Sequence, residues 1–361
     1  IVFAAGCVLS AAAPGIASFL AGRVIQGVGS GWFSGFAMVA IAQLFPERQI
    51  ARVFAIIAGV WGVATLLGPM VGGLFAEAGN WRAVFWIFFG QAALFATLAP
   101  LLLKEAKAQS MAKAIPLTQL LLVTVGISAI ALADLAGSRG GSLALIFGGF
   151  FVLTLVFWVD ARAEVRLMPH RAGDPRTLVG AGYLALFALS ATSMPFSIYV
   201  PPVLQQLKGF SPLQAGYVVA ALALAWTCCA FIVSNVVSGR ETPWIRLGGT
   251  LIAAGAILQQ LAVPTTFIPY IAIGGIVMGC GFGCSTSLTN RLLLRTLAPE
   301  DQAIGSAALM SIRQVGGAVG AALAGVAANM AGFDRGLTAA SARGTADSVF
   351  LAVIPLAFIG M

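Results

Sequence analysis

The stretch LAGRVIQGVGSG, residues 20–31, places one arginine and four glycines inside an apolar run that extends from residue 16 to residue 45. Only 9% of the 361 residues are Asp, Glu, Lys or Arg, and 60% are hydrophobic. This composition provides too little charge for a water-facing surface, whereas a membrane requires segments that satisfy their own backbone hydrogen bonds. Because the apolar runs are continuous rather than alternating, the sequence predicts an all-α, polytopic membrane protein.

Twelve apolar segments follow one another along the chain, separated by charged residues, Pro and Gly. The complete ones contain about 20 residues or more, enough at about 1.5 Å per residue to cross a hydrocarbon core of about 30 Å. Both chain ends lie in apolar runs, so we expect the chain to be cut within its first and last helices. The expected spans are residues 1–13, 16–44, 51–76, 83–103, 118–137, 142–160, 178–203, 213–238, 244–263, 267–295, 303–330 and 347–361.

The orientation of the spans follows from Lys and Arg in the short loops, which favour the cytoplasmic side. Alternate loops carry thirteen and five basic residues. This asymmetry predicts an inner (plasma) membrane protein whose basic loops, including residues 160–176, lie in the cytoplasm. The net charge of +8 then reflects topology and contact with the lipid bilayer, and no nucleic-acid partner is expected.

Glycines repeat between the two ends of the chain at an offset of 248 residues. The matching pairs are Gly27 and Gly275, Gly31 and Gly279, Gly35 and Gly283, Gly68 and Gly316, and Gly72 and Gly320. The second and tenth spans therefore correspond and run in the same direction, as in transporters built from parallel repeats. We expect two pseudo-symmetric six-helix bundles with an inserted helix pair, about fourteen spans in the whole protein, of which two precede Ile1.

This repeat predicts three regions. Residues 1–103 form the N-terminal bundle, residues 104–177 the inserted helix pair with its linkers, and residues 178–361 the C-terminal bundle. Glycines at every fourth position let a neighbouring backbone approach closely, either for packing alone or as a sliding surface between conformational states. Pro69, in LLGPMVGG, interrupts the third span and predicts a kink, structural or functional.

The order of these motifs resembles a known family. RVIQGVGSG in one span followed by GPMVGG in the next resembles two signature motifs of the major facilitator superfamily, the second being its antiporter motif. The inserted pair, NWRAVF (residues 80–85), LQQLKGFSPLQAG (204–216) and SIRQVGGAVGAALAG (311–325) resemble the fourteen-helix drug:proton antiporters. The resemblance implies a secondary transporter that exports hydrophobic or amphiphilic small molecules in exchange for protons by alternating access.

The resemblance also implies roles for particular residues. Arg23 matches the family arginine implicated in proton transfer, and Gly68, Pro69, Gly72 and Gly73 match the antiporter motif. The chain departs from that motif at Ala64, where relatives usually have glycine. The expected conformational residues are Gly27, Gly31, Gly35, Gly68, Pro69, Gly72, Gly73, Gly316, Gly317 and Gly320.

Eighteen of the twenty basic residues belong to the two sets of loops and the span ends beside them, and the two that remain, Arg23 and Arg313, lie inside predicted spans. A charge in the bilayer core is costly, so such residues face the bundle interior with a partner or extend to the interface. Gln26 continues the helix face of Arg23, and Gln314 lies beside Arg313. We expect these four residues to support proton coupling and transport, with at least one partner carboxylate in the two helices before Ile1.

Four aromatic residues are candidates to line a substrate cavity, although such residues in hydrophobic spans are more often packing or interface residues: Trp32, Trp61, Tyr199 and Trp226. The five cysteines lie in apolar runs and the single histidine, His170, lies in a loop far from them. Neither a metal site nor a cofactor is expected. The expected partners are a small-molecule substrate, protons and the bilayer, and a periplasmic adaptor stays open.

The pattern of apolar spans and glycines argues against two other classes of membrane protein and leaves a third one open. An enzyme would need a catalytic constellation, which the sequence lacks, and a channel would show a filter-like segment or rings of charge. The rival that stays open is a major facilitator uptake symporter or uniporter for a small metabolite.

Overall fold

A computed structural model describes residues 1–44, 60, 63–64, 67–102, 115–136, 138–237, 239–265, 267–333, 336 and 338–360. Within these residues the chain forms helices joined by short turns, and no strand occurs among them. Seven helices in this part of the chain are long and apolar enough to cross a membrane, and two shorter apolar helices, α1 and α5, accompany them. The prediction of an all-α, polytopic membrane protein is confirmed.

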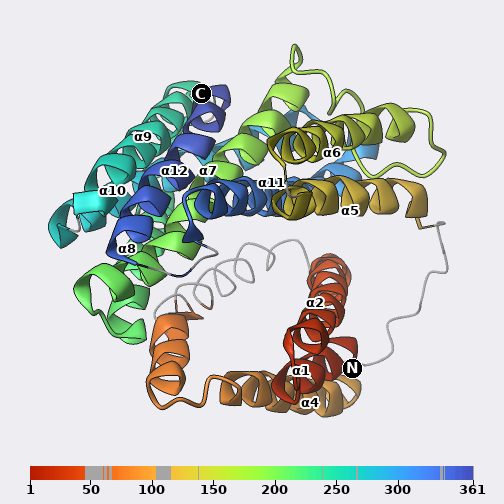
Figure 1. Cartoon of the computed structure of the whole chain (residues 1–361). Coiled ribbons are helices and arrows are strands. Elements are labelled where there is room, and N and C mark those ends of the chain that lie inside the picture. The colour runs from red at the N-terminus through yellow and green to blue at the C-terminus, as the bar shows by residue number, and fades with distance from the viewer. Residues whose placement is uncertain are drawn as a thin grey trace. The chain divides into compact units, whose positions relative to one another are not determined.

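The helices follow the predicted segments closely (Figure 1). Their bounds are α1 Val2–Ala11, α2 Ile16–Leu44, α4 Ala83–Leu102, α5 Leu117–Ala131, α6 Arg139–Asp160, α7 Leu178–Lys208, α8 Pro212–Val233, α9 Glu241–Ala262, α10 Ile268–Thr296, α11 Gln302–Met330 and α12 Ala339–Ile359. Residues 67–77, inside the third predicted segment, are also helical.

Helix α12 begins eight residues earlier than the apolar run that predicts it. Thr338 and Ser341 form a reciprocal capping box at its N-terminus, which satisfies backbone N–H groups that the helix leaves unpaired. Helices α6 and α7 begin similarly, because Ser138 accepts from the N–H of Gly141 and Thr177 from that of Gly180. Capping by hydroxyl side chains therefore sets helix starts that hydrophobicity does not mark.

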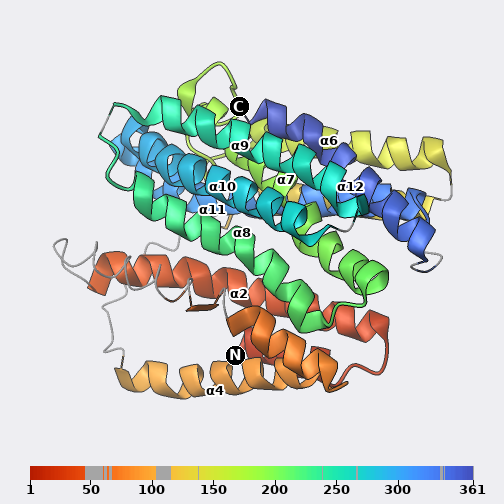
Figure 2. The same ribbon diagram turned by 90° about the vertical axis from the view of Figure 1, so that its left-hand side faces the viewer.

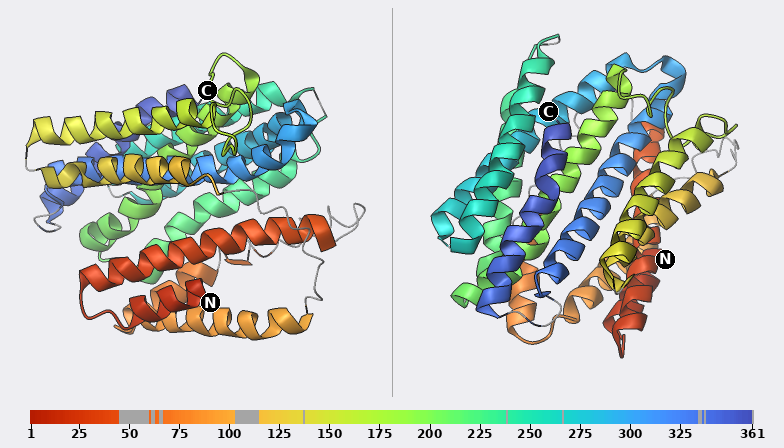
Figure 3. Two further views of the ribbon diagram at one scale, coloured as in Figure 1. Left: turned by 90° about the vertical axis from the view of Figure 1, so that its right-hand side faces the viewer. Right: turned by 45° about the horizontal axis from the view of Figure 1, so that its top comes forward.

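The described chain divides into two compact units. The first contains residues 1–112 with 211–214, and the second residues 113–210 with 215–361. In the first unit α1 packs on both α2 and α4, as the left view of Figure 3 shows. The contact is close because glycines face it: an added Cβ would lie 2.5 Å from Ser10 Oγ at Gly22 and would collide with the Phe3 backbone at Gly29.

The second unit is built around α7, which packs against α10, α11 and α12. Helices α9 and α10 lie side by side along their length (Figure 2), and the α5–α6 hairpin packs through α5 on α11. Phe196 and Val200 of α7 and Ile252 of α9 are fully buried in the main apolar cluster. The inserted helix pair of the prediction thus lies in the same compact unit as the helices that follow it.

The two units repeat one packing pattern. Helix α1 contacts α2 and α4 in the first unit, and α9 contacts α10 and α12 in the second. The glycine offset pairs α2 with α10, so each helix of one trio has its counterpart in the other. These contacts agree with the glycine offset, and the internal repeat itself stays a prediction.

Candidate functional site

Arg23 lies on α2 at the centre of a small polar group. Its guanidinium donates a hydrogen bond to Gln26 Oε1, one turn further along the helix. Gln26 is 6% exposed and donates from Nε2 to Cys7 Sγ of α1 at 3.2 Å. The guanidinium carbon also lies 5.7 Å from the centre of the Phe85 ring of α4. Three helices of the first unit thus hold one arginine in a fixed direction.

The NWRAVF segment secures the turn that precedes α2. Arg82 donates to the carbonyl of Ala13 at 3.1 Å, and its guanidinium carbon lies 4.4 Å from the centre of the Trp81 ring. Phe19 meets both Trp81 and Phe85 edge-on, with ring centres 5.6 Å apart in each case. A basic residue in a predicted outer loop therefore fixes the start of the helix that carries Arg23.

Arg313 lies on α11 among aromatic side chains of the second unit. Its guanidinium carbon is 5.0 Å from the centre of the Trp226 ring of α8. Trp226 in turn stacks on Phe282 of α10, with ring centres 5.3 Å apart and planes tilted by 33°. Arg313 is half-buried, whereas Gln314 beside it is exposed. The structure therefore joins Arg313 with Trp226, and places Gln314 on another face of α11.

The glycines of the repeat have different surroundings in the two units. An added Cβ at Gly279 would collide with the carbonyl of Leu222 in α8, and one at Gly283 would lie 2.6 Å from Cys229 Cβ. Their counterparts Gly27 and Gly31 have no described atom within 4 Å of an added Cβ, so α1 packs on Gly22 and Gly29 instead. The surroundings of Gly35, at the far end of α2, lie outside the described residues.

Gly68 and Gly72 of the antiporter segment differ from their counterparts in α11 in the same way as the glycines of α2 differ from those of α10. An added Cβ at Gly68 or Gly72 would meet no described atom within 4 Å, Pro69 is half-buried and Gly73 is buried. In α11, Gly316 and Gly320 lie directly against the α7 backbone. An added Cβ at Gly317 would make an ordinary contact of 3.6 Å with Met194.

Two of the four predicted cavity aromatics, Trp226 and Tyr199, lie in the second unit and have different aromatic neighbours. Trp226 takes part in the Arg313 stack, and Tyr199 packs edge-on against Phe333 with ring centres 5.5 Å apart. Trp32 is 59% exposed in the first unit, and Trp61 lies outside the described residues. Phe282, which the sequence analysis did not select, is the aromatic partner that the structure adds to Trp226.

Comparison with known proteins identifies the family. The sequence profile of the Major Facilitator Superfamily matches residues 1–321. The chain belongs to the major facilitator superfamily. It is therefore a transmembrane carrier of small molecules, as its resemblance implies.

Several curated members of the superfamily are similar to this chain. A probable multidrug-efflux transporter of Mycobacterium tuberculosis is 30% identical over 379 aligned residues, which cover 100% of this chain and 77% of that protein. An efflux pump of Aspergillus parasiticus is 27% identical, covering 88% of this chain and 65% of the pump. A methylenomycin A resistance protein of Streptomyces coelicolor is 26% identical, covering 90% and 69%.

This major facilitator chain also contains charged groups that the sequence analysis passed over. Glu241, at the start of α9, is buried and pairs with both Arg291 and Arg295 of α10 at 3.4 Å. Arg291 also donates to the carbonyl of Val236 at 2.8 Å. The sequence shows that these charges are opposite in sign and lie near the facing ends of two helices. Only the packing of α9 on α10 brings them together.

The α6–α7 linker of this major facilitator chain folds around a buried carboxylate. Asp160 accepts from the backbone N–H groups of Leu167 at 2.6 Å and Met168 at 3.0 Å, and from Gln119 Nε2 at 3.3 Å. His170 then binds Asp301, through its backbone N–H at 3.0 Å and through Nδ1 at 2.9 Å. The linker therefore connects the α5–α6 hairpin to the α10–α11 turn.

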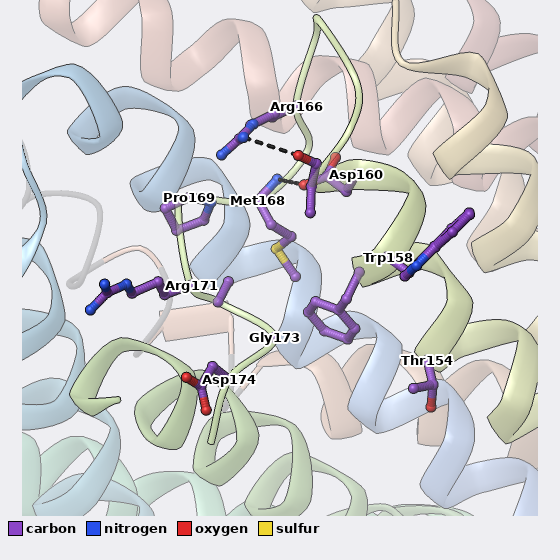
Figure 4. A pocket seen from close by; sticks show the side chains of 12 residues that line it. Thr154, Trp158, Asp160, Arg166, Met168, Pro169, Arg171, Gly173 and Asp174 are labelled. Atoms are coloured by element: carbon purple, nitrogen blue, oxygen red, sulfur yellow. Dashed lines mark hydrogen bonds between the residues drawn. The ribbon is translucent and has the colours of Figure 1, made fainter. Parts of the chain in front are cut away.

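A cavity of about 340 Å³ lies between this linker and the end of α6 (Figure 4). Phe157 and Met168 form its apolar lining, and Arg166 and Arg171 extend from the linker beside it. Asp160, at its edge, already receives three hydrogen bonds. The arrangement fixes the linker rather than presenting a reactive group.

Proposed function

We propose that this chain exports hydrophobic or amphiphilic small molecules in exchange for protons by alternating access. The observation that carries the proposal is the similarity of the entire chain to a relative named as a probable multidrug-efflux transporter. Further relatives are named as an efflux pump and as a resistance protein. We place the protein in the inner membrane with its basic loops in the cytoplasm, as the loop charges predict.

Within this proposal, Arg23 belongs to the proton-coupling part of the protein. Arg23 acts by its charge on a neighbouring titratable group. Gln26 and Phe85 hold the Arg23 guanidinium in the direction that this interaction requires. The glycines of α2, α10 and α11 and Pro69 serve the helix movements between states.

Proton-driven transport in everted membrane vesicles tests the proposal. The full chain is expressed and a panel of anionic, neutral and cationic fluorescent amphiphiles is offered under an acid-inside gradient. Accumulation of at least one compound, abolished by a protonophore, is the expected result. Absence of accumulation for all of them, with gradient-driven uptake of a nutrient into right-side-out vesicles, would establish the uptake transporter instead.

The matched variants are Arg23→Gln and Arg343→Gln. Arg343 is exposed near the start of α12, so its replacement removes the same charge at a position without a proposed role. A hydrogen bond to a charged group contributes roughly 1.5–3 kcal/mol, so we expect Arg23→Gln to lower the initial rate about tenfold to hundredfold. Equal rates for the two variants at equal expression would remove Arg23 from the mechanism.

A further inference from the structure

The Arg313 guanidinium lies near the middle of the second unit, far from either end of its helix. It is eleven residues after Gln302, the first residue of α11, which corresponds to about 16 Å along the helix axis. A charged side chain at this depth is costly even on the mildest scale. Arg313 is also only half-buried, so its donors stay accessible to a ligand.

Among the described residues, no carboxylate neutralises Arg313. The ion pairs found there join Asp301 with His170, and Glu241 with Arg291 and Arg295. Among these residues Arg313 contacts the Trp226 ring, and its guanidinium carbon lies 5.0 Å from the centre of that ring. This cation–π contact uses the face of the guanidinium. Its N–H donors, which lie in the plane, stay available for an anion.

The aromatic neighbours provide a surface for an apolar body next to this charge. Trp226 and Phe282, from α8 and α10, stack on each other beside the guanidinium. Aromatic rings of a ligand pack favourably against such a pair, offset or edge-on. The planar guanidinium matches a carboxylate or sulfonate with two parallel hydrogen bonds, and low dielectric strengthens the attraction.

We propose that Arg313 and Trp226 form an anion-binding subsite, and that the transported compounds are anionic amphiphiles, an aromatic or aliphatic body carrying a carboxylate or sulfonate. The inference rests on the proposed function, since it names the substrate class of the same carrier. Cationic amphiphiles are disfavoured because they would bring a like charge to Arg313, beside which no carboxylate lies among the described residues.

Two probes of opposite charge test this directly. Pyrene-1-butanoate and pyrene-1-butylammonium share one aromatic body and differ in the sign of the charge. Binding to the full chain in nanodiscs of zwitterionic lipid is followed by energy transfer from tryptophan to pyrene, with protein-free nanodiscs subtracted. We expect saturable binding of the anion with a Kd about tenfold or more below that of the cation, as a charge-assisted pair implies.

Variants at position 313 then assign the effect. We expect Arg313→Gln to raise the Kd of pyrene-1-butanoate about tenfold or more. Arg313→Lys should recover part of the affinity, because lysine keeps the charge but lacks the planar fork of arginine. Arg343→Gln should leave the Kd unchanged. Thermal unfolding shows whether each variant is folded, and the wild-type comparison of the two probes stands even if Arg313→Gln is not.

The inference is overturned if the cation binds as tightly as the anion, if neither probe saturates, or if folded Arg313→Gln binds the anion as the wild type does. Transport separates this failure from failure of the proposed function. Gradient-driven export of the cationic probe without the anionic one overturns the substrate class alone, whereas export of no compound of any charge overturns the proposed function.

Discussion

At the scale of single residues, the two arginines of the spans are accommodated in different ways. Arg23 is held by an amide and an aromatic ring, and the amide in turn donates to the Cys7 sulfur. Arg313 lies on an aromatic face, and no described carboxylate pairs with it. A charge in the bilayer core is costly, and the two arginines meet this cost with different neighbours.

Glycine contacts in α11 lead to a prediction about stability. An added Cβ at Gly320 would collide with the backbone carbonyl of Ala191, which cannot rotate away as a side chain can. We expect Gly320→Ala to cost about 1–3 kcal/mol, typical of overpacking. The measurement is the thermal unfolding temperature of the purified protein, which should fall by several degrees.

The matched control is Gly317→Ala on the same helix. Its added Cβ would lie 3.6 Å from Met194 Cε, an ordinary contact with a flexible side chain, and alanine is the better helix former by about 1 kcal/mol. We expect its unfolding temperature to be unchanged or higher. A similar decrease for both alanines would show that α11 and α7 are not in close backbone contact at Gly320.

At the scale of elements, the α6–α7 linker shows how a loop acquires a fixed conformation. Asp160 ends α6 and turns back to bind the N–H groups of Leu167 and Met168. His170 then attaches the linker to Asp301, beyond α10. Two carboxylates thus connect the inserted hairpin with the turn between α10 and α11.

Replacement of Asp160 by Asn tests this attachment. The amide nitrogen of Asn cannot accept a hydrogen bond, so at least one backbone N–H loses its partner, at a cost of about 1–3 kcal/mol. We expect tryptic cleavage within residues 161–177 to become about five- to hundredfold faster, because the linker opens more often. Mass analysis of the fragments locates the cuts.

The control for this experiment is Glu164→Gln, which removes an exposed carboxylate from the same linker. Its cleavage rate should equal that of the wild type. Equally slow cleavage of Asp160→Asn would mean that the linker keeps its conformation without the Asp160 carboxylate.

At the scale of the whole molecule, the charge of the loops predicts the orientation in the membrane. From the thirteen-to-five division of basic residues we expect the α6–α7 linker in the cytoplasm and the α7–α8 turn outside. Those two connections flank α7, which is 31 residues long and amply spans a bilayer. Their locations should therefore be opposite.

Reporter fusions at the two ends of α7 measure the orientation. A green fluorescent protein joined after Glu164 should fluoresce and an alkaline phosphatase there should be inactive, since only the cytoplasm allows the first to fold. After Gly209 the two results should be reversed. Phosphatase activity after Glu164 would invert the whole topology and with it the direction assigned to transport.

The sequence by itself determined the all-helical class and the order of the spans that the structure describes, and it singled out a glycine repeat and two unusual arginines. Hydrophobicity and charge act locally in a membrane, because each span must satisfy its own backbone and exclude charge from the bilayer core. These properties are therefore readable from a window of about 20 residues.

Only the tertiary structure decided which side chains meet. It placed Phe282 beside Trp226, turned Gln314 away from Arg313, and chose Gly22 and Gly29 rather than Gly27 and Gly31 for the α1–α2 contact. It also joined Glu241 to two arginines more than 45 residues away along the chain. Such contacts depend on the rotation of each helix about its axis and on its neighbours, and side-chain spacing within one span does not fix either.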